Sequence, residues 1–259
     1  MSGVEGRIAW ISASSSGLGL ACASALAKAG ATVFINGRDE DRLEAARQEI
    51  VATSPDARVV TVAADLTTDA GIDRAVEACP APDILINNNR GPKSGGFDEI
   101  TDDDVREALE LHLWAPLHLV RAHLPGMRQR RFGRIVNITS AMVASPRNTQ
   151  FASTAPRAAF SAMMKALQHE VVADNVTINQ VLPYRIDSPR QVQNAQREVA
   201  QERISYEEAR RRQAVSVAAG RLGAPYEFAH ACLFLCDEDA GFISGLNVRV
   251  DGGSYTGLL

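Results

Sequence analysis

The feature that most constrains the fold is a regular alternation of two kinds of segment along the chain. Seven short runs are rich in β-branched and apolar residues, which is typical of strands buried on both faces of a sheet. These runs cover residues 7–12, 31–36, 59–63, 84–87, 134–138, 177–181 and 247–250. Between them, apolar residues recur three or four positions apart, which predicts helices over residues 19–29, 40–51, 68–78, 105–128, 154–173 and 225–236. Strands that alternate with helices predict an α/β fold with a parallel, doubly wound sheet.

No internal repeat, low-complexity tract or proline-rich linker divides the 259 residues, so we expect a single domain over residues 1–259. In a sheet of this kind the ligand binds beyond the carboxyl ends of the strands, where the winding direction reverses. The loops after the first, fourth, fifth and sixth predicted strands are therefore the expected location of the chemistry.

The charge balance argues against a polyanionic partner. The chain has 27 basic and 31 acidic residues and a net charge of −4, so it lacks the basic surplus that drives binding to nucleic acid or to an anionic membrane. No apolar run approaches the roughly 18 residues that a membrane span needs, and the N-terminus lacks the basic and apolar parts of a signal peptide. We expect a cytoplasmic protein with no nucleic acid and no membrane as a partner.

The four cysteines are few and scattered, as expected for reduced thiols in the cytoplasm. Cys232 and Cys236 would share a helix face near His230, but a closed zinc site needs four ligands. We therefore expect no metal site and interpret Cys22, Cys79, Cys232 and Cys236 as buried thiols.

A loop of small residues follows the first predicted strand and opens the first helix. Its residues are Ser12, Ala13, Ser14, Ser15, Ser16, Gly17, Leu18 and Gly19. Glycines let the backbone approach a pyrophosphate, which then rests on the free N–H groups and the positive end of the helix, and the serines can add hydroxyl donors. Any tight turn between a strand and a helix also favours glycine and serine. The position of the loop in the first strand–helix unit makes dinucleotide binding the better interpretation.

The end of the second predicted strand discriminates between the two nicotinamide dinucleotides. Sites for NAD usually place an acid there, about twenty residues after the glycines, to hold the ribose 2′-hydroxyl. This chain has Asn36, Gly37 and Arg38 instead. Arg38 would bind a 2′-phosphate, with Asn36 and Ser14 as lesser contacts, so we predict NADP(H) as the cofactor. In the alternative interpretation, Arg38 is a solvated residue at the start of the next helix.

Further motifs follow in the same order as in a known family, the short-chain dehydrogenases and reductases, which the chain resembles from the first strand to the C-terminus. The matching positions are the 12–19 loop, the pair Asp65 and Leu66, the turn 87–91 with Asn88 and Gly91, the strand 133–140 and the closing signature 244–253. The resemblance implies that Asp65 and Leu66 lie beside the adenine and that Ser140, at the end of the strand, is the catalytic serine. The branch of β-ketoacyl-thioester (3-oxoacyl carrier-protein) reductases is the most similar. The resemblance implies a Rossmann-type sheet of seven parallel strands, Ser140 near the nicotinamide, Pro183 at the cofactor site, and a homotetramer or homodimer.

The family's catalytic tyrosine and lysine have no counterparts in this chain. Thirteen residues after Ser140, where the family has Tyr-x-x-x-Lys, stand Ser153 and Arg157. An aliphatic hydroxyl is a much weaker acid than a phenol, and a guanidinium does not release a proton near neutral pH. Arg157 can still hold the nicotinamide ribose or a substrate carboxylate.

Two other side chains are candidates for moving the proton. His112 stands where the family has its relay asparagine, and an ordinary histidine titrates near about pH 6.5, so it can act as acid or base. Pro116 lacks an N–H, which frees the carbonyl of residue 112 in a kinked helix as an anchor for water. Tyr184, after the sixth strand, offers a phenol. In the alternative interpretations His112 is packed and hydrogen-bonded, Tyr184 only covers the nicotinamide side, and Ser140 only forms a turn.

Two polar stretches complete the predictions. Residues 188–217 are long and charged, with Glu–Arg pairs at helical spacing, and we expect a mobile helical lid over the substrate. Residues 128–134 are basic but lie at a helix C-terminus, where cations complement the dipole. We interpret them as a solvated turn rather than a phosphate-binding patch.

These observations predict an NADP(H)-dependent oxidoreductase of the short-chain type. It would transfer a hydride between nicotinamide and a carbonyl or hydroxyl substrate, a 3-oxoacyl thioester or a small ketone, with a non-standard proton relay through His112, Tyr184 or water. Two alternatives stay open: an NADP(H)-binding protein without redox turnover that serves as a sensor or partner subunit, and a non-redox reaction such as elimination on the same fold.

Overall fold

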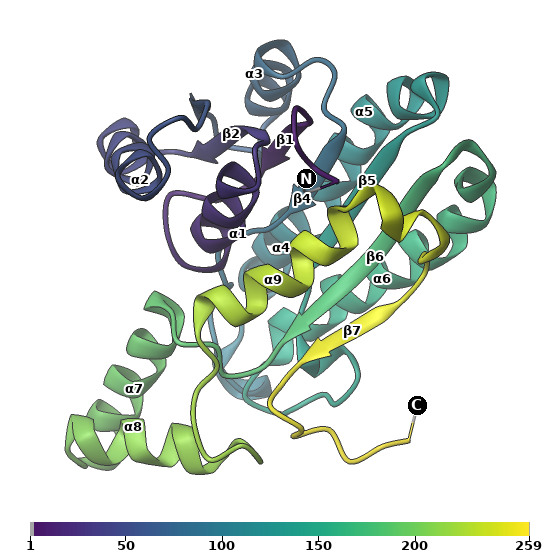
Figure 1. Cartoon of the computed structure of the whole chain (residues 1–259). Coiled ribbons are helices and arrows are strands. Elements are labelled where there is room, and N and C mark those ends of the chain that lie inside the picture. Colours follow the sequence, from purple (N-terminus) through teal and green to yellow (C-terminus); the bar gives the residue numbers. More distant parts are fainter. Residues whose placement is uncertain (1–2, 259) are drawn as a thin grey trace.

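Seven parallel strands form one sheet in the order β3-β2-β1-β4-β5-β6-β7 (Figure 1). The computed structural model describes residues 3–258. The strands are β1 (Ile8–Ile11), β2 (Thr32–Gly37), β3 (Val59–Ala63), β4 (Ile84–Asn87), β5 (Gly133–Ile138), β6 (Val176–Pro183) and β7 (Asn247–Val250). The predicted doubly wound parallel sheet is confirmed, and every strand end lies within two residues of its expected position. The winding direction reverses between β1 and β4.

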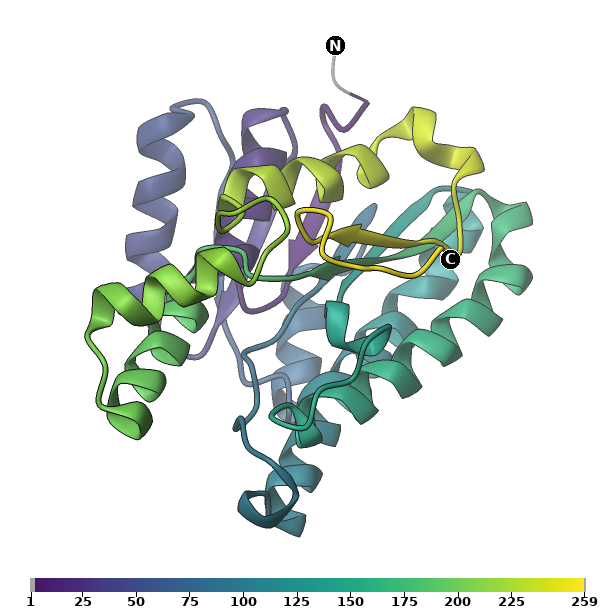
Figure 2. The ribbon, with the colours of Figure 1, turned by 90° about the horizontal axis from the view of Figure 1, so that it is seen from below.

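Helices cover both faces of the sheet (Figures 1 and 2). One apolar core joins the sheet to α1 (Gly17–Lys28), α2 (Glu40–Thr53) and α9 (Pro225–Cys236). The other core joins it to α3 (Asp69–Ala78), α5 (Ala115–Arg130) and α6 (Phe151–Val171). Because successive side chains of a strand point to opposite faces, Ile11 belongs to the first core and Trp10 to the second.

The predicted helix 105–128 is divided into three parts. It consists of α4 (Asp102–Leu109), a π-helical turn (Glu110–Trp114) and α5, which has Pro116 in its first turn. A π-turn inserts an extra residue, so carbonyl groups there lose their usual helical donors. The Leu111 carbonyl accepts a hydrogen bond from Asn89 Nδ2 instead. The helix is irregular before Pro116, as predicted, but the carbonyl group with a partner outside the helix is that of Leu111 rather than that of residue 112. This hydrogen bond connects the helix to the loop after β4.

The cysteines are all free and buried, as expected. Cys22, Cys232 and Cys236 lie in the core between α1 and α9, whereas His230 is exposed. Within residues 3–258, no group of three histidine, cysteine or acidic side chains is arranged to hold a metal ion. No helix in that part of the chain is long and apolar enough to cross a membrane.

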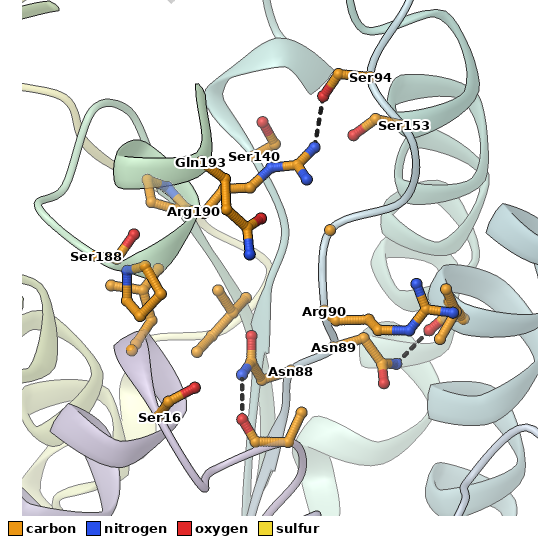
Figure 3. Close-up of a pocket in the computed structure, with 18 of the residues that line it drawn as sticks. Ser16, Asn88, Asn89, Arg90, Ser94, Ser140, Ser153, Ser188, Arg190 and Gln193 are labelled. Carbon is orange, nitrogen blue, oxygen red and sulfur yellow. Dashed lines mark hydrogen bonds between the residues drawn. The ribbon is translucent and has the colours of Figure 1, made fainter. Parts of the chain in front are cut away.

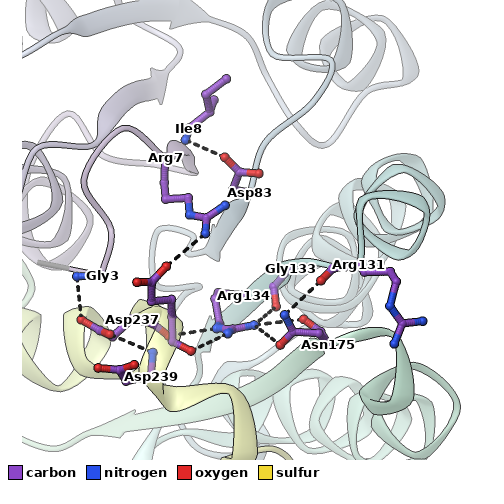
Figure 4. A network of polar contacts seen from close by, with 11 residues as sticks. Gly3, Arg7, Ile8, Asp83, Arg131, Gly133, Arg134, Asn175, Asp237 and Asp239 are labelled. Atoms are coloured by element: carbon purple, nitrogen blue, oxygen red, sulfur yellow. Dashed lines mark hydrogen bonds and ion pairs between the residues drawn. The ribbon is translucent and has the colours of Figure 1, made fainter.

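The basic stretch 128–134 is only partly the solvated turn that its position predicts. Arg128 and Arg131 are at the surface and pair with Asp174. Arg134, however, is only 1% exposed, and the expectation of a solvated side chain is wrong for it. Its guanidinium donates to four backbone carbonyl groups at the amino end of the sheet (Figure 4), those of Gly133, Asn175, Asp237 and Glu238. Arg134 is buried because hydrogen bonds to these four carbonyl groups compensate for its lost hydration.

The buried His123 on α5 makes the stability of the fold depend on pH. Neither of its ring nitrogens has a hydrogen-bond partner among the described residues. Burial, and to a smaller extent the charge of Arg130, lowers the pKa of His123 to about 4. In the unfolded chain this histidine has an ordinary pKa of about 6.5, so the unfolded chain binds the proton more tightly than the folded protein does. The contribution of His123 to the free energy of unfolding is therefore fully present above about pH 6.5 and is lost as the pH decreases.

We expect His123 to account for a loss of about 2 kcal/mol of unfolding free energy between pH 7 and pH 5. Replacement of His123 by leucine should remove this part of the pH dependence, whereas replacement of the exposed His169 by glutamine should not. Urea unfolding at the two pH values measures the difference. An unchanged pH dependence in His123→Leu would contradict the assignment.

Candidate active site

One large pocket, of about 1350 Å³, lies beyond the carboxyl ends of the strands. The loops after β1, β2, β3, β4, β5 and β6 line it, together with one face of α7 (Pro189–Glu202) (Figure 3). The pocket therefore lies at the reversal of the strand order, where ligands of doubly wound sheets bind. The predicted lid 188–217 consists of α7 and α8 (Tyr206–Val215), and the expected motion of these helices stays a prediction.

The start of α1 forms a cradle at one side of the pocket. Ser15, Ser16, Gly17 and Leu18 line it, and Ser16 makes no side-chain cap, so the first N–H groups of the helix are free for a ligand. Gly17 has a φ of +61°, a left-handed conformation that favours glycine. This arrangement fits a pyrophosphate at the helix N-terminus.

The turn before α1 is folded tightly against the loop after β4. Asn88 lines the pocket and its Nδ2 donates to the Ala13 carbonyl at 3.0 Å. Gly19 lies against this bond: a Cβ atom there would be 2.5 Å from the Ala13 oxygen and 2.8 Å from Asn88 Nδ2. Only glycine therefore fits at residue 19 without a shift of the turn.

Three predicted cofactor contacts use their polar groups inside the protein instead. Ser12 Oγ accepts from Trp10 Nε1, and Ser14 Oγ donates to the Ile11 carbonyl and accepts from the Asn36 N–H. The Asn36 amide donates to carbonyl groups at the end of β3 and accepts from the Ala13 N–H. Ser12 and Ser14 are buried and do not line the pocket, so the expectation of a cofactor contact is corrected for them: their polar groups hold the turn in place. Asn36 lines the pocket, and its contact with the cofactor stays a prediction.

The far side of the cradle carries the predicted adenine and 2′-phosphate residues. Arg38, Asp65 and Leu66 line the pocket. Arg38 Nη1 lies 3.6 Å from Asp65, and the Arg38 side chain is 61% exposed, so this ion pair is weak and the guanidinium can bind a phosphate. Burial acts to raise the pKa of Asp65, but hydrogen bonds from Thr67 and the charge of Arg38 outweigh it and lower that pKa.

The opposite end of the pocket brings together Ser140, Ser153 and Arg157, as the resemblance implies. Ser140 Oγ accepts from the Met142 N–H at 3.1 Å, which leaves its hydroxyl hydrogen free to donate. Arg157 Nη1 donates to the Ser153 carbonyl at 2.9 Å and also to the Ser153 hydroxyl. Burial, and then the charge of Arg190, lowers the pKa of Arg157 to about 9. Gly91 and Pro183 also line this end.

His112 lies behind this end of the pocket rather than in it. It borders a separate cavity of about 20 Å³, together with Asn89, Thr139 and Arg157. Its Nε2 is buried and has no hydrogen-bond partner within residues 3–258. Burial, and then the charge of Arg157, holds the pKa of His112 well below 6.5. The expectation of a histidine that titrates near neutral pH is therefore corrected: His112 is neutral there and cannot serve as an imidazolium acid.

Tyr184 lines the pocket, but its hydroxyl faces the lid. Its Oη lies 3.4 Å from Ser216 Oγ, and the Arg147 guanidinium lies 5.0 Å from its ring. Burial acts to raise the pKa of Tyr184, but the hydrogen bond with Ser216 and the nearby charges of Arg147 and Arg185 outweigh it and lower that pKa. Tyr184 is the one predicted proton carrier that is both phenolic and adjacent to the substrate end.

The sequence reasoning missed Arg190, in the first turn of α7. Arg190 lines the pocket and donates from Nη2 to Ser94 Oγ at 2.6 Å (Figure 3). The only sequence signal was its position directly after Ser188 and Pro189, which are typical of a helix start.

Comparison with known proteins places this chain among the short-chain dehydrogenases and reductases. The family model described as "Enoyl-(Acyl carrier protein) reductase" matches residues 12–255, and the chain belongs to this family of the short-chain dehydrogenases and reductases.

Relatives match over nearly their whole length. The NADPH-dependent reductase BacG of Bacillus subtilis is 30% identical over 97% of this chain and 99% of its own. The acetoacetyl-CoA reductase of Rhizobium meliloti is 34% identical over 96% and 98%. The crystal structure of L-sorbose reductase from Gluconobacter frateurii, in complex with NADPH and L-sorbose, superposes with a TM-score of 0.92 at 31% identity, covering 98% of each chain.

Proposed function

We propose that the protein is an NADP(H)-dependent reductase of carbonyl compounds. The observation that carries this proposal is a single pocket with a helix N-terminus and Arg38 at one end and Ser140 at the other. The names of BacG and of the L-sorbose reductase complex support NADPH as the cofactor. The names of the acetoacetyl-CoA and L-sorbose reductases support a 3-oxoacyl thioester or a small ketone as the substrate class.

Ser140 and Arg157 replace the usual set of catalytic groups in this proposal. When bound, NADPH supplies the hydride that reduces the carbonyl carbon. Ser140 donates its hydroxyl hydrogen to the carbonyl oxygen and fixes the orientation of the substrate. The guanidinium of Arg157 stabilises the negative charge that develops on that oxygen, as a fixed charge in a buried site does most effectively.

The proton reaches the oxygen from water in this proposal, because the aliphatic hydroxyl of Ser153 is a weak acid and Arg157 acts as a fixed positive charge. The 20 Å³ cavity beside His112 has room for one water molecule, and it joins neutral His112 to Arg157. Tyr184 is the second relay candidate, since its pKa is below the ordinary value of a phenol. We further propose that the protein is a cytoplasmic homo-oligomer, a tetramer or dimer, with no nucleic acid or membrane as a partner.

The test of the cofactor assignment is a calorimetric titration with NADPH and NADH. We expect clearly tighter binding of NADPH, and we expect Arg38→Asp to weaken it about 10- to 30-fold while NADH binding improves, because the carboxylate repels the 2′-phosphate and accepts from a ribose hydroxyl. Arg58→Asp, the same charge change at the exposed amino end of β3, should leave both affinities unchanged. Equal binding of both dinucleotides by the wild type would refute the preference.

The missing tyrosine and lysine favour one alternative, a protein that binds NADP(H) without redox turnover. Tight NADPH binding combined with no oxidation across a broad panel of ketones, oxo acids and their esters would establish it. No binding of either dinucleotide would refute both proposals.

A further inference from the structure

The substrate end of the pocket is rich in arginine although the chain as a whole is acidic. Two of these arginines are neutralised, since Arg90 pairs with Glu107 and Arg197 pairs with Glu99. Within residues 3–258, four others form no ion pair with a carboxylate, namely Arg147, Arg157, Arg185 and Arg190. Glu110 and Glu198 also line the pocket but do not pair with these four. Uncompensated positive charge in a pocket favours an anionic ligand.

Arg157 provides a buried donor that the protein does not use. Its side chain is only 9% exposed, and both of its hydrogen bonds run from Nη1 to Ser153. Its Nε is buried and has no acceptor in the part of the chain that the structure describes. Its Nη2 forms no hydrogen bond within residues 3–258 and is not fully buried, so it is the donor that a carboxylate in the pocket can reach. A charged group with unused N–H donors is costly to bury, and a carboxylate oxygen would compensate for that cost.

Arg190 is held in place by the protein while most of its donors stay free. Its Nη2 donates to the Pro92 carbonyl at 2.9 Å and to Ser94 Oγ at 2.6 Å, and Figure 3 shows the side chain directed toward Ser94. A Cβ atom at Gly91 would lie 2.8 Å from the Arg190 guanidinium carbon, so glycine at that position lets the guanidinium lie against the backbone. Partial immobilisation of this kind lowers the entropic cost of binding an anion.

We propose that the substrate is a 2-oxo acid whose carboxylate is bound by Arg157 and Arg190 while Ser140 donates to its carbonyl oxygen. The carboxylate and the carbonyl group are on adjacent carbons, so the Arg157 guanidinium that binds the first also stabilises the charge that develops on the second. This inference rests on the proposed reductase function and specifies its substrate class. Guanidinium groups match carboxylates in charge and in the spacing of their donors. The carboxylate is unchanged in the reaction. The carbonyl carbon gains a hydride from NADPH, the carbonyl oxygen gains a proton from water, and the hydroxide that remains takes up a proton from the solvent. The products are a hydroxy acid and NADP⁺.

The experiment compares benzoylformate with its methyl ester, which keeps the carbonyl group but lacks the charge. We expect the wild type to reduce the acid with a kcat/KM at least about 10-fold higher than the ester. Arg190→Gln should remove this preference by lowering the value for the acid alone. Arg197→Gln changes an arginine on the same helix that is already paired with Glu99, and it should retain the preference. Unfolding temperatures and NADPH affinities of both variants serve as controls.

Binding measurements separate this inference from the proposed function. Calorimetry of benzoylformate against the protein saturated with NADP⁺ requires no turnover. Binding of the acid that Arg190→Gln abolishes would support the carboxylate site even if no reduction occurred. Equal values for acid and ester in the wild type would overturn the inference, as would an Arg190→Gln variant that loses NADPH affinity and keeps its preference for the acid.

Discussion

Replacement of Ser140 by alanine is expected to lower kcat for benzoylformate and its ester by about 100- to 1000-fold, the usual effect of removing a donor to a developing oxyanion. The Ser140 oxygen already accepts from the Met142 N–H, so its own hydrogen is the group available to the substrate. NADPH affinity should stay within a factor of about two, because the phosphate cradle and Arg38 are at the other end of the pocket. Single-turnover loss of nicotinamide absorbance measures the step directly.

Two further variants show whether the effect belongs to the hydroxyl. Ser140→Thr keeps both the donor and the acceptor for Met142, and it should retain most of the activity. Ser145→Ala removes an exposed hydroxyl shortly after the short 3₁₀-helix η3 (Ala141–Val143) and should leave kcat unchanged. A Ser140→Ala enzyme with unchanged kcat would mean that Arg157 and the other guanidinium groups alone polarise the carbonyl.

The sheet was predictable because its signals are local. Apolar β-branched runs and the three-to-four spacing of the helices each extend over a few residues, and the rules for connecting them leave only a few topologies. The small-residue loop before α1 and the basic Arg38 are equally local, and both line the pocket as expected.

The partners of individual polar side chains were not predictable in this way. Ser14 and Asn36 form a hydrogen bond with each other across 22 residues of sequence, and the Asn36 amide donates to carbonyl groups at the end of β3, 26 and 28 residues away. Their sequence neighbours do not reveal these partners. Arg134 looks like part of a basic surface stretch until the loop after α9 supplies its acceptors. Long-range partners of this kind decide whether a polar residue is available to a ligand.

The character of the substrate end also depends on long-range contacts. His112 is an ordinary histidine in the sequence, and only its burial beside Arg157 lowers its pKa. Arg190 belongs to a charged lid in which no position stands out, until the fold places it against Gly91. The absence of Tyr-x-x-x-Lys indicated an altered site from the sequence, whereas the unpaired guanidinium groups became visible only in the folded chain.

The second large effect is expected at Gly19, where alanine should weaken NADPH binding about 100-fold. The added Cβ would meet the Ala13 oxygen at 2.5 Å and the Ser14 Cα at 2.9 Å, and neither backbone atom can yield without opening the turn that carries the free N–H groups. Overpacking of this kind costs about 3 kcal/mol, which corresponds to a factor of about 100 in affinity if the turn opens on the ligand side.

Gly96→Ala is the matched control, because the nearest atom to its added Cβ would be 3.8 Å away, and it should leave NADPH affinity unchanged. Calorimetry gives both affinities, and thermal unfolding shows whether Gly19→Ala remains folded at the temperature of the titration. A folded Gly19→Ala protein with wild-type affinity would mean that the cofactor does not rest on the start of α1. In the proposed function Gly19 affects only the binding of NADPH, whereas Ser140 acts on the substrate. A Gly19→Ala protein with weakened NADPH affinity should therefore reach the wild-type kcat at saturating NADPH. The Ser140→Ala protein should keep a low kcat at any NADPH concentration.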